Sequence, residues 1–351
     1  MESSLFDSDS VIDEEQVDSL SRTLGMQFSM DLSEGGITLA NPEVPRGWLQ
    51  SIDDEDRLQF NYYNAFKDFL TGEGRPIKVI KENEKIVDDI FQITVMKPEI
   101  DSEEQLPVVY LTDANTSLGS GCDIVNMLML GGEIPPVILV GVGYPLAGNF
   151  NEFIRLRTRD FSPTLDEWQT PNQAELAGIE SKDMLCGGAP KFLEFLTDEL
   201  REFIGSKFNV SEDSTYIGDS MGGLFGTYTL FNRPESFKRY IIGSPWICWD
   251  YPLCFDYEKE YAKNNNDLDA IVYMAAGGDE HILYPNLPEP LVPVFEKANT
   301  AQHARDMFKL IEDRNYPNLN FTGKIIDDET HFTIISGLIA KGLRTVFNQL
   351  S

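Results

Sequence analysis

Short apolar runs recur along the chain from residue 76 onward, each followed by a longer segment of mixed apolar and polar residues. Runs of about four to eight residues rich in Val, Ile, Tyr and Phe are typical of β-strands. They predict strands at residues 91–96, 107–111, 136–142, 214–218, 239–243, 270–276 and 321–326. The run at 136–142 is apolar throughout, which indicates a strand buried on both faces.

Between these runs, apolar residues spaced three or four apart predict helices. The predicted helices cover residues 192–204, a segment that begins at Ser220, residues 295–311 and residues 332–350. Strands that alternate with helices are typical of a mainly parallel central sheet covered by helices on both faces. The predicted fold class of residues 76–351 is therefore α/β.

The first 75 residues have a different pattern. They carry 16 Asp or Glu against 5 Lys or Arg and few β-branched runs. The first 19 or so are polar and acidic, which predicts disorder. Further along, apolar residues recur four apart as on one face of a helix, at Leu58, Tyr62, Phe66 and Leu70. We expect residues 1–75 to form an acidic, partly disordered arm that either packs on the catalytic domain at 76–351 or makes a dimer contact.

Charge narrows the set of partners. The chain of 351 residues holds 58 Asp and Glu and 28 Lys and Arg, which gives a formal net charge of -30. Such a charge repels nucleic acids and anionic membranes, and no basic run offsets it. No apolar run approaches the length of about 20 residues that spans a bilayer. We expect a small-molecule partner, with no nucleic acid and no membrane, and a homo-oligomer stays open.

The cysteines and the N-terminal residues indicate where in the cell the protein is expected. Cys122, Cys186, Cys248 and Cys254 form no C-x-x-C pair and show no zinc-ligand spacing. We expect them to be free thiols in the core. The N-terminal residues lack the basic and apolar stretches of a signal peptide. These features predict a cytoplasmic protein.

The sequence G-D-S-M-G at residues 218–222 is the most specific chemical signal. A G-x-S-x-G pentapeptide between a strand and a helix forms the sharp turn that carries the nucleophilic serine of α/β hydrolases. Glycines flank the serine because strand and helix approach closely at this turn. We predict Ser220 as the nucleophile. The backbone N–H of Met221, at the helix N-terminus, is predicted to bind the developing oxyanion.

Only three histidines are available as the base, namely His281, His303 and His331. In α/β hydrolases the acid and then the histidine follow the serine along the chain. His331 follows the strand at 321–326 through a polar loop, at the sheet edge where the serine is expected. His303 falls within a predicted helix, and His281 directly follows an acid. His331 is therefore the predicted general base.

The residues alone leave the acid open. Asp279 and Glu280 both follow the strand at 270–276 and lie between nucleophile and base in the sequence. Either carboxylate can orient the imidazole and stabilise its protonated form. In so acidic a chain both can also be ordinary loop residues. A Ser–His dyad without a close acid is a further alternative.

Several longer stretches resemble one family. From residue 76 to the end, the chain resembles the putative-esterase family of α/β hydrolases, in its siderophore-esterase-like and esterase D-like branch. Besides the G-D-S-M-G turn at 218–222, the similar stretches are Y-L-T-D-A-N at 110–115, R-T-R-D-F-S-P-T at 157–164, G-A-P-K-F-L at 188–193 and S-P-W-I-C-W-D at 244–250. The resemblance implies an α/β-hydrolase fold and the hydrolysis of an ester.

The resemblance also implies roles for the catalytic residues. Ser220 and His331 match the family's nucleophile and base. Glu280 matches its acid, so it is preferred to Asp279. Asn115 matches the second backbone donor to the oxyanion, beside Met221.

Two positions depart from the family pattern. Ala114 replaces a glycine, which is expected to shift the oxyanion loop. Trp246 replaces a small serine beside the acyl pocket that the resemblance implies. A tryptophan there either narrows the pocket and favours a small acyl group or offers an aromatic wall, so Trp246 is assigned to substrate binding.

Other polar side chains have two interpretations. Arg155, Arg157 and Arg159 either hold an anionic part of the substrate or form structural ion pairs, for example with Asp160. We assign Arg159 to substrate binding. Tyr144 is also assigned to substrate binding, as part of the pocket wall; the alternative is that Tyr144 and the proline after it simply form a turn.

The predicted reaction is two-step acyl transfer from a small acyl ester through an acyl-enzyme on Ser220. This chemistry needs no metal and no organic cofactor. Three alternatives stay open: an acyltransferase with the same triad, a siderophore trilactone esterase, and a non-catalytic binding protein on the hydrolase fold. The net charge disfavours a polyanionic siderophore unless the arginines create a local positive patch.

Overall fold

The computed structural model describes residues 28–31, 36–39, 77–83, 89–98, 104–145 and 149–347. The chain divides into two units, Met1–Pro76 and Ile77–Ser351. In the first unit, β1 (Phe28–Asp31) pairs antiparallel with β2 (Gly36–Leu39). The predicted disorder at the start of the chain and the predicted helix around residues 58–70 lie outside the described residues.

A sheet of eight strands forms the centre of the second unit, in the order β10-β9-β8-β7-β5-β6-β4-β3. The strands from β10 to β6 run parallel, while β4 and β3 pair antiparallel at one edge. The prediction of a mainly parallel sheet is confirmed, and β3 is a strand that the sequence pattern missed. The bounds are β3 Ile77–Asn83, β4 Asp89–Met96, β5 Leu106–Leu111, β6 Ile138–Gly143, β7 Val210–Asp219, β8 Arg239–Gly243, β9 Ala270–Gly277 and β10 Leu319–Ile326.

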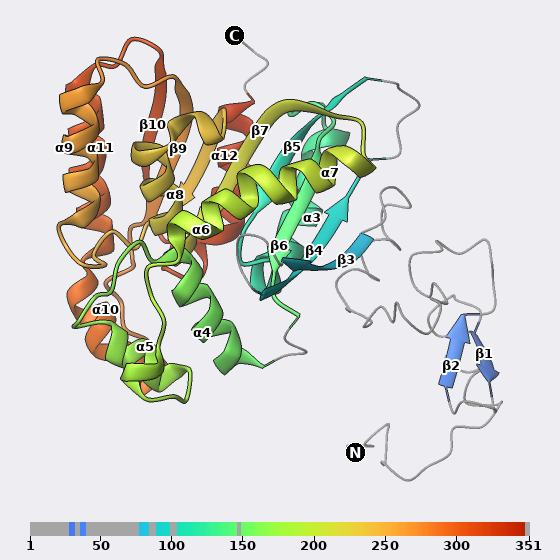
Figure 1. Ribbon diagram of the computed structural model, residues 1–351, viewed down its shortest axis with the longest axis horizontal. Coiled ribbons are helices and arrows are strands. Elements are labelled where there is room, and N and C mark those ends of the chain that lie inside the picture. The colour runs from blue at the N-terminus through green and yellow to red at the C-terminus, as the bar shows by residue number, and fades with distance from the viewer. Residues whose placement is uncertain are drawn as a thin grey trace. The chain divides into compact units, whose positions relative to one another are not determined.

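Helices cover both faces of this sheet (Figure 1). One face is covered by α3 (Ala114–Leu130) and α12 (Ile334–Val346). The other is covered by α4 (Phe150–Phe161), α6 (Ala189–Glu194), α7 (Arg201–Lys207), α8 (Met221–Asn232), α9 (Leu253–Asn264) and α11 (Thr300–Arg314). The remaining helical segments are α5 (Thr170–Leu176), α10 (Val292–Ala298), the π-helical segment η2 (Phe195–Leu200) between α6 and α7, and the short 3-10 turns η1 Ser181–Asp183, η3 Pro234–Ser236 and η4 Glu289–Leu291.

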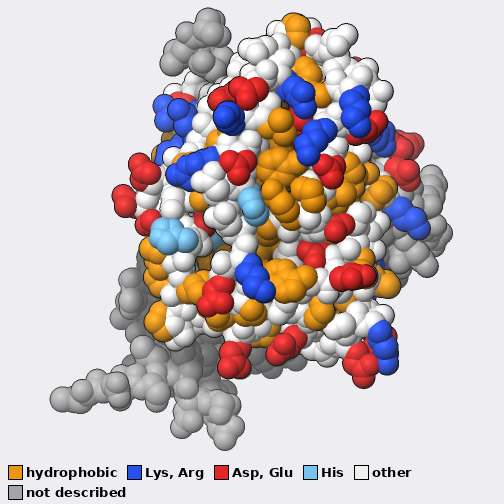
Figure 2. All heavy atoms as spheres, turned by 90° about the vertical axis from the view of Figure 1, so that its left-hand side faces the viewer, with side chains coloured by type: hydrophobic (Ala, Val, Ile, Leu, Met, Phe, Trp, Pro, Cys, Tyr) orange, Lys and Arg blue, Asp and Glu red, His pale blue; other side chains and the backbone are white. Residues whose placement is uncertain are grey.

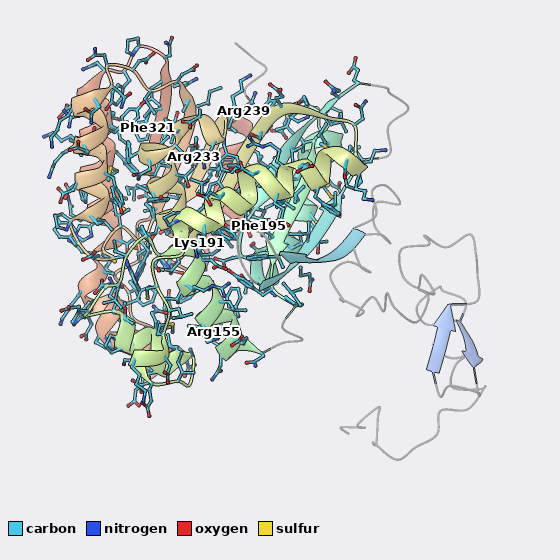
Figure 3. All side chains as sticks on the ribbon, viewed as in Figure 1. Arg155, Lys191, Phe195, Arg233, Arg239 and Phe321 are labelled. Carbon is cyan, nitrogen blue, oxygen red and sulfur yellow. The ribbon has the colours of Figure 1, made fainter. Side chains whose placement is uncertain are left out.

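Each face of the sheet has its own buried apolar cluster. In β7, Tyr216 belongs to the cluster under α8, and its neighbour Ile217 belongs to the cluster under α3 and α12. This division follows from the alternation of side chains along a strand. Phe195, labelled in Figure 3, belongs to the first cluster and stacks on Phe91 of β4 with ring centroids 4.3 Å apart. Burial on both faces explains why β6 is apolar along its whole length.

The predicted helix over residues 295–311 consists of two helices. Asn299 adopts a left-handed conformation with φ 47°, so α10 ends before it and α11 begins after it. Asn is one of the few residues that enters this region readily, because its short polar side chain bonds locally. The break separates the two helices, and Phe295 of α10 packs edge-on against His331.

The charged surface, the length of the helices and the state of the cysteines can be compared with what the sequence predicts. On the face shown in Figure 2, Lys and Arg side chains are interspersed with Asp and Glu, and apolar side chains gather between them. Within the described ranges, no helix combines the length and the apolar character needed to cross a membrane. The four cysteines are free, with Cys122 and Cys254 buried and Cys186 and Cys248 partly exposed.

Candidate active site

The carboxyl ends of the parallel strands bring the candidate residues together. Because β5, β7, β8, β9 and β10 run parallel, the loops that follow them meet at one edge of the sheet. Ser220 follows β7, Glu280 follows β9 and His331 follows β10. Three segments that are distant in sequence therefore contribute one polar side chain each to the same place.

Ser220 lies on a strained turn between β7 and α8. Its φ of 58° and ψ of -119° fall outside the regions that L-residues prefer, as expected of a nucleophile elbow. The turn is held because the Ser220 N–H donates to the carbonyl of Gly243 at the end of β8, at 3.0 Å. A Cβ on Gly218 would lie 2.5 Å from the carbonyl oxygen of Gly222, so only glycine fits there. These constraints aim the hydroxyl of Ser220 away from the sheet.

His331 bonds directly to the serine. Its Nε2 lies 2.9 Å from Ser220 Oγ, and the residue is only 5% exposed. The rings of Trp246 and Phe295 pack edge-on against the imidazole, each with centroids 5.0 Å apart. The loop that carries His331 is tied to the loop after β9, because Asp279 N–H donates to the Glu329 carbonyl at 2.9 Å.

Glu280 is the carboxylate that reaches the imidazole. Its Oε2 lies 2.9 Å from His331 Nδ1, and its Oε1 accepts from Ser244 Oγ at 2.5 Å and from the Gly277 N–H at 2.7 Å. Burial opposes ionisation of this side chain. The hydrogen bonds from His331, Ser244 and Gly277 outweigh burial, so the pKa of Glu280 is lowered from its ordinary value. Asp279 contributes its backbone N–H to the loop contact described above.

The two backbone N–H groups predicted to bind the oxyanion belong to Met221, which directly follows Ser220, and to Asn115. The Met221 N–H is the first of α8, and the Asn115 N–H lies in the first turn of α3, where helical N–H groups have no intrahelical acceptor. The Asn115 side chain holds Tyr144 at the end of β6, because its Nδ2 donates to the Tyr144 carbonyl and its Oδ1 accepts the Tyr144 N–H, each at 2.8 Å. Asn115 thus fixes the turn after β5 against β6.

A cavity of about 350 Å³ opens beside the serine. We call it the serine cavity; Ser220, Met221, Trp246 and His331 lie on its wall together with apolar side chains that include Phe150, Phe153, Ile154 and Leu176. Trp246 is fixed in this wall, because its indole N–H donates to Gln169 Oε1 at 2.7 Å. The size matches the lower end of ordinary small-molecule pockets.

The arginines separate into three environments. Arg157 lines the serine cavity, where it forms a bidentate pair with Asp113 at 2.9 and 2.6 Å between the rings of Phe153 and Phe161. Arg159 lies outside the residues that line this cavity and pairs with Asp160 at 2.7 and 3.0 Å. The structural ion pair that the sequence left open for these arginines is thus present at Arg159.

Tyr144 and Arg155 also lie outside the lining of the serine cavity. The Tyr144 hydroxyl donates to Asp160 Oδ2 at 2.9 Å, so it joins the same buried polar group as Arg159. Arg155, labelled on α4 in Figure 3, pairs with Glu152 one turn away, with atoms 2.6 and 2.7 Å apart. Of the side chains assigned to substrate binding, Trp246 alone lies on the cavity wall among the described residues.

Asp219 and Ser244 are site residues that the sequence reasoning left without a role. Asp219, one residue before Ser220, lines the serine cavity, and its Oδ1 has no hydrogen-bond partner among the described residues. Burial raises its pKa to about 7, with the negative charge of Glu280 adding to the effect and His331 opposing it. The sequence signal that could have identified Asp219 is its position inside the G-D-S-M-G turn. Ser244 lies in the S-P-W stretch that resembles the family, and that stretch indicates no role for its hydroxyl.

Comparison with known proteins decides the family. Residues 86–268 match the family model described as putative esterase. The chain belongs to the putative esterase family. The ferri-bacillibactin esterase of Bacillus subtilis is 26% identical over 245 residues, covering 68% of this chain and 78% of the relative. The siderophore triacetylfusarinine C esterase of Aspergillus fumigatus is 30% identical over 258 residues, covering 69% and 82%.

Solved structures of this family share the fold. A siderophore hydrolase from Aspergillus nidulans superimposes with a TM-score of 0.67 at 20% identity, covering 79% of this chain and 95% of that chain. A BES protein from Bacillus cereus gives a TM-score of 0.62 at 23% identity, with 83% and 97% covered. The predicted α/β-hydrolase fold and the family resemblance are both confirmed, and ester hydrolysis is the activity named for the curated relatives.

Proposed function

We propose that this protein is a serine esterase that cleaves a carboxylic ester through an acyl-enzyme on Ser220. The observation that carries the proposal is the continuous hydrogen-bonded path from Ser220 Oγ to His331 to Glu280, with both contacts at 2.9 Å, beside an apolar cavity. A nucleophile, a base and a group that orients the base are the parts that this chemistry needs.

In the first step, Ser220 Oγ attacks the ester carbonyl carbon while His331 Nε2 takes the hydroxyl proton. The carbonyl oxygen becomes an oxyanion, which the backbone N–H groups of Met221 and Asn115 bind. The tetrahedral intermediate collapses, and His331 returns the proton to the departing alkoxide. Water then attacks the acyl-enzyme with His331 again as the base, which releases the acid and restores Ser220.

Glu280 acts through the imidazole. As an ionised carboxylate it holds the proton on Nδ1, so that Nε2 is free to accept the proton of Ser220, and it stabilises the imidazolium that forms. The bonds from Ser244 and Gly277 support this role because they keep the buried carboxylate ionised and fix its orientation.

The acyl group is small in this proposal. The ring of Trp246 lies against the imidazole of His331 and is held by Gln169, so it cannot swing aside without losing a buried hydrogen bond. A fixed indole beside the nucleophile limits the length of an acyl chain. The esters that fit best then carry short acyl groups.

The test is hydrolysis of p-nitrophenyl esters from acetyl to octanoyl. Wild type should cleave the short chains best, and Ser220→Ala should reduce turnover to the background rate. Ser206→Ala, which removes an exposed serine hydroxyl, serves as the matched control and should retain full activity. Turnover by Ser220→Ala at the wild-type rate for any chain length would remove the serine from the mechanism.

A siderophore ester is the second candidate substrate, because curated relatives are named as esterases of ferri-bacillibactin and of triacetylfusarinine C. Within the described residues of the serine cavity, the Arg157 guanidinium is already paired with Asp113, so it offers little free positive charge to an anionic ligand. Incubation with each ferric siderophore, followed by chromatography and mass spectrometry, tests this candidate. Release of the monomer by wild type but not by Ser220→Ala would establish it.

A further inference from the structure

A second cavity, of about 500 Å³, adjoins the serine cavity. We call it the histidine cavity, because His331 lies on its wall while Ser220 and Met221 do not. It is formed by the segment between β9 and η4 and by the segment between β10 and α12. Phe295, His331 and Phe332 line both cavities, so these three rings form the partition between them.

The position of the imidazole between the cavities assigns a direction to the ester. In the reaction, the oxygen of the departing alcohol must receive a proton from His331 Nε2, so the alcohol lies on the side of the imidazole. The carbonyl oxygen must lie at the Met221 N–H, and Met221 lines the serine cavity. An ester that satisfies both requirements has its acyl half in the serine cavity and its alcohol half directed toward the histidine cavity.

We propose that the histidine cavity binds the alcohol half of the ester and selects an uncharged alcohol that carries an apolar or aromatic group. This proposal rests on the serine-esterase function given above and adds the class of substrate that the site takes.

The side chains of the histidine cavity fit such a group. Ile282, Tyr284 and Phe332 are 42%, 56% and 62% exposed, so an apolar ligand that covers them removes much apolar surface from water. Leu287 adds a further apolar surface. The rings of Phe295 and Phe332 lie 5.7 Å apart at 33°, and the outer face of the pair offers a flat surface for an aromatic ring.

Charge in the histidine cavity excludes an anionic alcohol. None of the described residues that line it is Lys or Arg, and its polar members Asn286, Thr330 and Thr333 are neutral. Its one carboxylate is Glu280, both of whose oxygens already accept hydrogen bonds. Asp279 and Glu329 belong to the same two segments, so an anion entering here meets negative charge, and none of the described lining residues is a Lys or Arg that could balance it.

The experiment varies the alcohol while the acyl group stays acetyl. We would measure kcat/KM for ethyl, phenyl and 2-naphthyl acetate with wild type, Tyr284→Ala and Tyr251→Ala. Tyr251 is a matched control because it is 57% exposed and lines neither cavity. Tyr284→Ala should lower the ratio of kcat/KM for 2-naphthyl acetate to kcat/KM for ethyl acetate by about 2- to 10-fold.

A second arm tests charge selection with 4-acetoxybenzoate, the carboxylated analogue of phenyl acetate. Wild type should cleave it more slowly than phenyl acetate, although its phenol is the better leaving group. Asn286→Lys should raise the ratio of kcat/KM for the anion to kcat/KM for phenyl acetate by about 5-fold.

The outcomes separate this proposal from the function on which it rests. The alcohol site is overturned if Tyr284→Ala and Tyr251→Ala have equal effects on all three acetates. It is also overturned if the effect of Tyr284→Ala follows the length of the acyl group in a series of ethyl esters. A failure of Asn286→Lys to favour the anion overturns the charge selection. Hydrolysis that survives in Ser220→Ala overturns the serine-esterase function instead.

Discussion

Replacing Asp219 by Asn should change how stability depends on pH. Asp219 is buried beside the nucleophile, and its Oδ1 has no partner among the described residues. Its pKa in the folded protein is about 7, against an ordinary value of 3.8 that the unfolded chain should approach. Between these two values, folding takes up a proton that the unfolded chain has lost. Stability contributed by this residue is therefore complete below about pH 4 and is lost as the pH rises toward 7.

The size of the effect follows from the shift. A difference of about three pKa units corresponds to about 4 kcal/mol at most, since each unit is worth about 1.4 kcal/mol. Asn cannot ionise and is close in shape to the neutral acid. Asp219→Asn should therefore match wild type only below about pH 4, exceed it by about 1.5 kcal/mol at pH 5, and exceed it by about 4 kcal/mol at pH 8.

The assay is urea unfolding of both proteins at pH 5, 6, 7 and 8, followed by tryptophan fluorescence. Asp123→Asn, which removes an exposed carboxylate on α3, is the control and should follow the wild-type curve. Parallel curves for wild type and Asp219→Asn over this range would refute the reasoning. They would mean that the Asp219 carboxylate is solvated or paired in the folded protein.

Three further predictions concern the site. Glu280→Gln should lower kcat by about 10³- to 10⁴-fold with little change in KM, because the imidazole loses the charge that fixes its tautomer; steady-state kinetics test this, and a loss below 10-fold contradicts it. Arg157→Ala should cost about 3 kcal/mol in urea unfolding, because it leaves Asp113 unpaired in a largely buried place, and an unchanged midpoint contradicts it. Trp246→Ala should move the optimum of the p-nitrophenyl ester series to longer chains, whereas an unchanged optimum shows that the indole does not limit the acyl group.

Much of the sheet could be predicted because buried parallel strands are marked by composition. β6 and β8 are buried at every residue, and their sequences are short runs that are apolar except for Arg239 at the start of β8. β3 was missed because its sequence, I-K-V-I-K-E-N, mixes lysines into the apolar pattern, as is common at the edge of a sheet.

A helix was harder to predict where it is stabilised by packing against other elements and its sequence lacks a clear helical periodicity. α3 contains Asn, Thr, Ser and Gly in its first turns, which favour turns as much as helix. It forms because Leu118, Val125 and Leu128 pack against the sheet and α12. A single sequence does not show that partner, so α3 was left without an assignment.

The chain order predicts that the loops carrying Ser220, Glu280 and His331 meet at one edge of the sheet, but it does not predict which way the side chains of a helix face. Residues two apart on a helix point about 200° from each other, so Arg157 and Arg159 of α4 cannot share one environment. Which of them faces the cavity depends on how α4 packs, which the sequence does not show, and Arg159 was the residue predicted to bind substrate. The structure puts Arg157 on the cavity wall and Arg159 beside Asp160.

The central claim is that Ser220 is the nucleophile, and covalent labelling tests it most directly. Wild type would be treated with a fluorescent alkyl phosphonate that reacts with activated serines, and the labelled peptide would be identified by mass spectrometry. The expected result is one label per chain at Ser220, no label on Ser220→Ala, and much slower labelling of Glu280→Gln. A label on another serine, or equal labelling of wild type and Ser220→Ala, would contradict the claim.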